Sequence, residues 1–247
     1  MRILVACEES QAVCIELRRL GHEAYSCDLM ECSGGHPEWH IVGDVLPLLN
    51  GRCEFTTMDS IPHKIDDRWD AVIAFPPCTH LTSSGAPWFA KKRVDGRQRE
   101  GVEFFCKVMS ADTDILIVEN PVGIMSGDYV VKWYPDIAWE YGLPYKPVQK
   151  IQPYWFGHNA RKTTCLFGHG FKPLEATEIV DPGEMTADGH SYGASAAYAR
   201  DENGKILAWN DPRTAVIRSK TPPGVARAIA EQIFGDARKE EHHEPED

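Results

Sequence analysis

Two side chains that can do chemistry directly follow short apolar segments of this 247-residue chain. Cys78 stands after Pro76-Pro77, at the end of the apolar segment 71–75, and Glu119 follows the apolar segment 115–118. A thiolate can form a covalent intermediate, and a carboxylic acid can protonate the same substrate. The plainer alternatives are a buried thiol without reactivity and a surface carboxylate. The pair indicates covalent catalysis assisted by an acid.

The elements that would position these groups alternate between strand and helix. Apolar runs predict strands and periodic segments predict helices, over the ranges 2–6 (strand), 11–20 (helix), 23–27 (strand), 69–75 (strand), 94–109 (helix) and 115–118 (strand). This order predicts an α/β fold with a largely parallel sheet flanked by helices, whose ligands bind at the carboxyl ends of the strands. Asp28, Cys78 and Glu119 all fall at such ends. After Tyr145 we expect mostly loops, with one helix over 222–234.

Composition favours a single folded domain outside the membrane. The apolar fraction is 43%, no apolar run is long enough to span a bilayer, and the first residues do not suit a signal peptide. Eight cysteines without a regular framework favour free thiols in a reducing cytoplasm. A zinc site is a weaker alternative, because its candidate ligands do not have the spacing of common zinc modules; they are Cys27, Cys32, His36 and His40. We therefore expect no metal.

The charge distribution bears on a polyanionic partner. The net charge of −11 is unfavourable for binding phosphate, although part of it belongs to the acidic tail 238–247, which we expect to be disordered. Basic side chains gather at Lys91, Lys92, Arg93, Arg97 and Arg99. This cluster is either a phosphate-contacting surface or an ordinary solvated one.

Four segments carry recognisable patterns. They are Pro76-Pro77-Cys78 with Ser84 and Gly85, Glu119-Asn120-Pro121, His36-Pro37-Glu38-Trp39-His40 leading into Gly43-Asp44-Val45, and Thr221-Pro222-Pro223-Gly224-Val225-Ala226. In this order they resemble motifs of the cytosine-5 DNA methyltransferases, especially the short members of phages and prophages. The resemblance covers most of the chain and implies a Rossmann-like class I S-adenosylmethionine-dependent methyltransferase fold. It also explains the two histidines without zinc.

The resemblance implies a role for each matching residue. Carbon 5 of cytosine is a poor nucleophile, and it becomes reactive when a thiolate adds to carbon 6 while an acid engages nitrogen 3. Cys78 would be the thiolate, Glu119 the acid, and Arg161 a contact to a cytosine flipped out of DNA. The implied cofactor, S-adenosyl-L-methionine, would lie against Ala6, Glu8, Ser10, Asp28, Asp44, Pro76 and Thr221. DNA would lie against Ser84, Arg97, Arg99 and Lys162.

Several of these residues also have simpler interpretations. Asp28 could cap a helix or belong to a loop, and Asp44 could be a turn residue. The segment at Thr221 could be a proline-initiated helix start, and Arg161 could be a solvated surface side chain.

The chain also departs from the family pattern. The segment Ala6–Gln11 lacks the glycines of the family's donor loop. The Gln-x-Arg-x-Arg motif is only partly matched by Gln152 and 161–164, and the target-recognition region would be reduced to about 168–210 within a single domain over 1–237. Two alternatives therefore stay open: methylation of RNA or a free cytosine nucleotide, and a catalytically silent DNA-binding or regulatory protein. The implied setting is a bacterial host cytoplasm, where such an enzyme would protect phage DNA from restriction.

Overall fold

The computed structural model describes residues 1–182, 203, 207–208 and 211–235. Its main sheet has seven strands in the order β3-β2-β1-β6-β7-β9-β8. The strands are β1 (Arg2–Ala6), β2 (Glu23–Asp28), β3 (His40–Val42), β6 (Ala71–Ala74), β7 (Ile115–Pro121), β8 (Gln149–Ile151) and β9 (Thr164–His169). The first five strands in the sheet order are parallel, and β9 runs antiparallel between β7 and β8. The predicted α/β fold is confirmed, and its strand order is that of the Rossmann-like class I fold.

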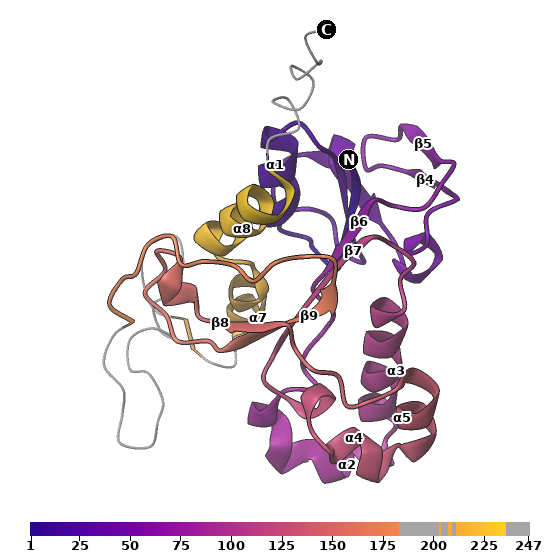
Figure 1. The fold of residues 1–247 in the computed structure, drawn as a ribbon, viewed down its shortest axis with the longest axis vertical. Helices are drawn as coiled ribbons and strands as arrows, with labels where there is room; N and C mark the ends of the chain where they lie inside the picture. The colour runs from indigo at the N-terminus through magenta and orange to yellow at the C-terminus, as the bar shows by residue number, and fades with distance from the viewer. Residues whose placement is uncertain (183–202, 204–206, 209–210, 236–247) are drawn as a thin grey trace, which may run out of the picture.

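Helices cover both faces of this sheet. Because side chains alternate along a strand, Ile3 and Val5 of β1 pack into one apolar cluster with α1 (Ala12–Arg19) and α8 (Pro223–Ile229). Leu4 and Ala6 face the opposite cluster, which contains the buried side of α3 (Arg97–Met109). Figure 1 shows α1 and α8 side by side and α3 apart from them. These two cores hold the parallel strands in place.

The remaining elements extend the domain beyond the sheet. The helices α2 (Phe89–Val94), α4 (Tyr129–Trp133) and α5 (Pro135–Tyr141) lie together near one end of α3, as Figure 1 shows. A separate antiparallel pair consists of β4 (Cys53–Thr56) and β5 (Pro62–Ile65), and α7 (Pro212–Ser219) precedes α8. The short turns are η1 (Pro37–Trp39), η2 (Leu46–Leu48), η3 (Ser83–Trp88), η4 (Ile124–Ser126), η5 (Pro153–Trp155) and the π-helical η6 (Ala230–Phe234).

Two predicted helices differ from the structure at their ends. The helix predicted over 94–109 is interrupted, because Gly96 has a φ of 84° and separates α2 from α3. A left-handed glycine ends a helix readily. The helix predicted over 222–234 is present, but its last turn widens into η6. In the described part of the chain, no helix is long and apolar enough to cross a membrane.

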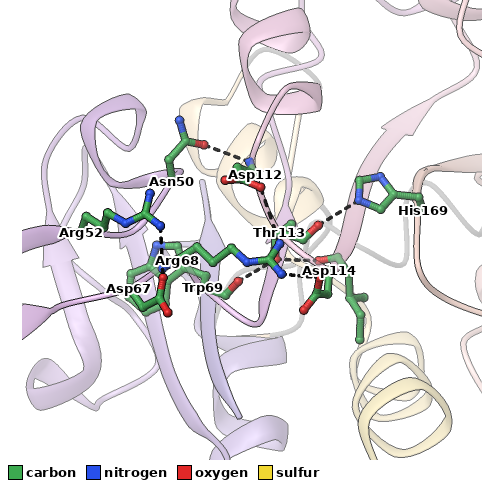
Figure 2. Close-up of polar contacts among 10 residues, drawn as sticks. Asn50, Arg52, Asp67, Arg68, Trp69, Asp112, Thr113, Asp114 and His169 are labelled. Carbon is green, nitrogen blue, oxygen red and sulfur yellow. Dashed lines mark hydrogen bonds and ion pairs between the residues drawn. The ribbon is translucent and has the colours of Figure 1, made fainter.

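A polar network secures the edge of the sheet where β6 and β7 begin. Figure 2 shows Arg68 between Asp112 and Asp114, with nitrogen–oxygen distances of 3.6 and 2.7 Å. The hydroxyl of Thr113 donates to the carbonyl of Trp69 at 3.0 Å, and His169 at the end of β9 contacts the carbonyl of Thr113, also at 3.0 Å. These contacts join the chain segments entering two neighbouring strands, whose opposite ends carry Cys78 and Glu119.

Candidate active site

Cys78 and Glu119 lie at the same edge of the sheet. Ala74, the last residue of β6, pairs in parallel with Val118 of β7. The residues that follow them, Phe75 and Glu119, therefore lie next to each other. The Nδ2 of Asn120 donates to the carbonyl of Pro76 at 3.4 Å, which ties the end of β7 to the loop that carries Cys78. The Glu119 carboxylate also acts electrostatically on the Cys78 thiol. The structure thus brings together the thiol and the carboxylate singled out in the sequence.

The loop carrying Cys78 is braced by backbone contacts to the turn after β7. The amide of Ile124 donates to the carbonyl of Leu81 at 2.9 Å, and the amide of Ser83 donates to the carbonyl of Val122 at 3.1 Å. A Cβ on the intervening Gly123 would lie only 2.1 Å from the Leu81 carbonyl oxygen. The close approach of the two backbones therefore requires glycine at this position.

A buried lysine supports the same loop from its other side. Lys92 of α2 is 9% exposed, and its ammonium donates to the carbonyl of Thr79 at 2.6 Å. The side-chain amide of Gln98 donates to the carbonyl of His80 at 3.2 Å. Lys92 stands in a run of basic residues, but it is buried and positions the thiol loop, which is the segment 75–82 that carries Cys78 between β6 and η3.

Opposing charges act on the thiol. Cys78 is half-buried, and burial raises its pKa above the usual value, with a further increase from the Glu119 carboxylate. The Lys162 ammonium opposes both, because a nearby positive charge favours the thiolate. The backbone amide of Lys162 donates to Gln152 Oε1 at 3.1 Å, and Gln152 Nε2 donates to Thr163 Oγ1 at 2.6 Å. The partly matched Gln152 segment thus fixes the turn that carries this cation.

A cavity opens beside these groups. Its walls come from the ends of β6, β7, β8 and β9 and from the start of α8, and it combines apolar side chains with one acid and two lysines. It is lined by Phe75, Glu119, Ile151, Pro153, Lys162, Thr164, Leu166, Ser219, Lys220, Thr221, Pro222, Val225 and Ile229. Such a mixture of apolar walls and a few polar groups is typical of small-molecule sites.

The loop after β1 is built differently from a glycine-rich loop. Cys7 and Gln11 both have a φ of 58°, so non-glycine residues adopt its left-handed conformations. The buried carboxylate of Glu8 accepts from the amides of Val13 at 2.7 Å and Cys14 at 3.2 Å, at the start of α1. Burial raises the pKa of Glu8 to about 8. The Glu8 side chain thus provides hydrogen-bond acceptors for these two backbone amides at the start of α1.

Two further carboxylates gather at the neighbouring strand ends. Asp28 ends β2 and accepts from the amide of Met30, and Asp44 follows β3 and accepts from the amide of Leu46, each through Oδ1 at 3.0 Å. Burial is the main cause that raises the pKa of the Cys7 thiol, and the negative charges of both aspartates raise this pKa further. Within the described ranges, the second oxygen of each aspartate has no hydrogen-bond donor, so both can accept from a ligand.

The other residues expected near the donor have varied surroundings. Ala6 is fully buried at the end of β1, and Pro76 is buried in the thiol loop. Ser10 Oγ accepts from the amide of Ala12 at 3.5 Å. Thr221 lines the cavity.

The two histidines of the alternative zinc site take part in packing. His40 is fully buried, with Nδ1 2.8 Å from Ser26 Oγ and Nε2 2.9 Å from the carbonyl of Met30. His36 stacks on Trp39 with ring centroids 3.9 Å apart. Among the residues that the structure describes, no cluster of three ligand-type side chains could hold a metal.

The residues expected to contact nucleic acid are spread over the surface. Arg161 is exposed, with its guanidinium 5.6 Å from the Tyr154 ring centroid, whereas the adjacent Lys162 lines the cavity. Arg97 pairs with Asp95 at 2.5 Å, Arg99 pairs with Asp136 at 2.5 Å, and Ser84 Oγ lies 2.9 Å from Thr82 Oγ1. The two arginines are therefore neutralised within the protein. Most of the expected recognition region, from 183 onward, and the acidic tail lie outside the described residues.

Comparisons with known proteins add little to this geometry. No family model matches the chain, and no curated protein matches it. Among solved structures it is similar to a prophage-encoded protein of Escherichia coli that is provisionally described as a DNA modification methyltransferase. The two are 13% identical with a TM-score of 0.43, and the match covers 73% of this chain but only 52% of that protein. Similarity at this level does not identify an activity.

Proposed function

We propose that this protein methylates carbon 5 of cytosine in DNA, with S-adenosyl-L-methionine as methyl donor and Cys78 as covalent nucleophile. The observation that carries the proposal is the convergence of Cys78 and Glu119 at the carboxyl edge of adjacent parallel strands, on a loop braced from both sides. The order of the four motif-like segments in the sequence supports the same reaction.

The proposed reaction uses each group in a defined way. The Cys78 thiolate adds to carbon 6 of the ring, and Glu119 in its protonated form gives a proton to nitrogen 3, which moves an electron pair onto carbon 5. Carbon 5 would then take the methyl group, which leaves the thioether S-adenosylhomocysteine. Water would take the proton from carbon 5, nitrogen 3 would return its proton to Glu119, and cleavage of the sulfur–carbon bond at carbon 6 would restore the aromatic ring and the thiolate. Lys162 would favour the thiolate before addition and its return as leaving group.

The hydrogen-bond acceptors at the strand ends fit S-adenosyl-L-methionine. When bound, this cofactor would supply a methyl group activated by a sulfonium centre. Asp28 and Asp44 have acceptor oxygens for the ribose hydroxyls and the adenine amino group, and Thr221 lines the neighbouring cavity. Because the Glu8 side chain is engaged at the start of α1, that residue would meet the donor only through its backbone.

A base stacked inside a duplex cannot reach the half-buried thiol of Cys78, so the target cytosine would be flipped out of the stack. Ser84 and Lys162 are the residues nearest the thiol loop for contacts to DNA. Arg97 and Arg99 would exchange their internal partners for phosphates, and Arg161 is exposed enough to do the same.

A second candidate substrate is RNA or a free cytosine nucleotide. The net charge of −11 and the internal neutralisation of Arg97 and Arg99 favour it, because affinity for duplex DNA normally depends on unpaired cations. The chemistry at Cys78 and Glu119 would be unchanged.

Transfer of a labelled methyl group tests the proposal. Wild type, Cys78→Ser and the control Cys53→Ser, which lies on β4 of the separate sheet, would be incubated with the donor and with duplex DNA, RNA or dCMP. We expect 5-methylcytosine in DNA from wild type and control, and none from Cys78→Ser. Label in RNA or dCMP alone would favour the second substrate, and label retained by Cys78→Ser would exclude the covalent mechanism.

A further inference from the structure

We propose that Glu9 and Lys220 together bind the α-amino-acid end of the methyl donor. The carboxylate of Glu9 would receive the ammonium group, and the ammonium of Lys220 would receive the carboxylate. The inference rests on the proposed function, because it takes S-adenosyl-L-methionine as the ligand. It gives a role to two charged side chains that the motif comparison did not single out.

Glu9 presents a buried carboxylate whose hydrogen-bonding capacity is not used. It is 8% exposed, and its Oε1 is fully shielded and has no hydrogen-bond partner among the described residues. The nearest cation is the Lys220 ammonium, 3.8 Å from this oxygen, which is too far for a hydrogen bond. A buried carboxylate without donors is costly. Glu9 is therefore suited to accept a charged donor group from a ligand.

Lys220 supplies the opposite charge at the rim of the cavity. It lines the cavity together with Glu119 and Thr221, and its side chain is 40% exposed. Its ammonium donates to Ser33 Oγ at 2.7 Å, which occupies one of its three donor positions. The remaining positions can serve a ligand carboxylate.

Ser33 holds the two charges in place before any ligand arrives. Its amide donates to the backbone carbonyl of Glu9 at 2.9 Å, while its hydroxyl accepts from Lys220. The loop of Glu9 and the segment before α8 are thereby fixed relative to each other. A preorganised pair binds its ligand at a smaller entropic cost.

The chemistry of this pair matches a zwitterion. An α-amino acid carries an ammonium and a carboxylate on the same carbon, and it can satisfy an acid and an amine that lie close together but do not hydrogen-bond each other. The loop of Glu9 follows β1, which lies between β2, with Asp28, and β6, with the thiol loop. A ligand with a nucleoside at one end and an amino acid at the other would place its nucleoside near Asp28 and Asp44.

Two ligands separate this role from a purely structural one. S-adenosylhomocysteine keeps the amino-acid end, whereas 5′-methylthioadenosine lacks it. Calorimetric titration would measure the affinity of each for wild type, Glu9→Gln and Lys220→Met. We expect each variant to lose roughly tenfold or more in affinity for S-adenosylhomocysteine, as for a lost charge-assisted hydrogen bond, and to bind 5′-methylthioadenosine as wild type does.

Controls make the outcomes distinct. Glu54→Gln on β4 and Lys146→Met, both exposed, should bind both ligands as wild type does. Unchanged affinity of Glu9→Gln and Lys220→Met for S-adenosylhomocysteine, or equal losses for both ligands, would overturn this inference alone. A wild-type protein that binds neither ligand would overturn the proposed function and this inference with it.

Discussion

Replacing Gly123 with alanine tests whether the contact between two loops positions the nucleophile. Gly123 lies in the turn after β7 and pairs with Thr82 of the thiol loop. An added Cβ would be 2.1 Å from the carbonyl oxygen of Leu81 and 2.9 Å from its carbonyl carbon. The φ of Gly123 is −167°, which alanine adopts freely, so the substitution introduces a clash without backbone strain. Both obstructing atoms are backbone, and neither can rotate away.

The structure sets the expected magnitude. The loops must separate by about 1 Å to reach a normal contact distance, which costs about 1–3 kcal/mol as overpacking. The separation also strains the hydrogen bonds from Ile124 to Leu81 and from Ser83 to Val122, worth about 1 kcal/mol each. If the strain removes about half of these two hydrogen-bond contributions, the free energy of unfolding falls by about 2–4 kcal/mol. A displacement of this size at the nucleophile should lower the methyl-transfer rate by about 100-fold.

Chemical denaturation and labelled methyl transfer measure these two effects. Gly127→Ala is the matched control, because the same turn region contains Gly127 and a Cβ there would meet nothing within 4 Å. The control should retain the stability and rate of wild type. If Gly123→Ala and Gly127→Ala behave alike in both assays, the contact does not position Cys78 and the reasoning is wrong.

Three further perturbations follow from the electrostatics. Lys162→Met should raise the pKa of Cys78 further, because the cation that lowers it is lost; alkylation of Cys78 followed by mass spectrometry should shift to higher pH, and an unshifted profile would contradict the assignment. Since burial raises the pKa of Glu8 from 4.5 to about 8, its ionisation should cost stability as pH rises across that interval. Urea midpoints of Glu8→Gln should therefore fall less with pH than those of wild type, and parallel curves would refute this. Arg68→Ala removes only exposed ion pairs, so its urea midpoint should stay close to that of wild type, and a clearly lower midpoint would show that the network in Figure 2 matters more than its exposure suggests.

The parallel core of the fold could be predicted from the sequence. Strands buried on both faces appear as continuous apolar segments, and the predicted segments 2–6, 23–27 and 115–118 correspond closely to β1, β2 and β7. The position of Cys78 and Glu119 beside each other followed from the rule that parallel strands carry their sites at one edge.

Other features depend on contacts that no local pattern records. β8 and β9 fall in a segment where frequent proline, glycine and aromatic residues predicted loops; instead, β9 is stabilised by pairing with β7, and β8 by pairing with β9. Lys92 belongs to a run of basic residues, yet its neighbours bury it beneath the thiol loop. Glu9 and Lys220 are 211 positions apart, and only the folded chain brings them to 3.8 Å.

The central claim is that Cys78 becomes bonded to carbon 6 of a cytosine in DNA. Duplex DNA containing 5-fluorocytosine tests it directly. Fluorine replaces the proton that must be lost from carbon 5, so the sulfur–carbon bond cannot be cleaved and the enzyme is not released. After incubation with S-adenosyl-L-methionine, we expect a denaturation-resistant protein–DNA complex whose peptide mass places the nucleotide on Cys78, and no complex with Cys78→Ser. A wild-type protein that methylates ordinary DNA but forms no such complex, or one linked through another residue, would contradict the account.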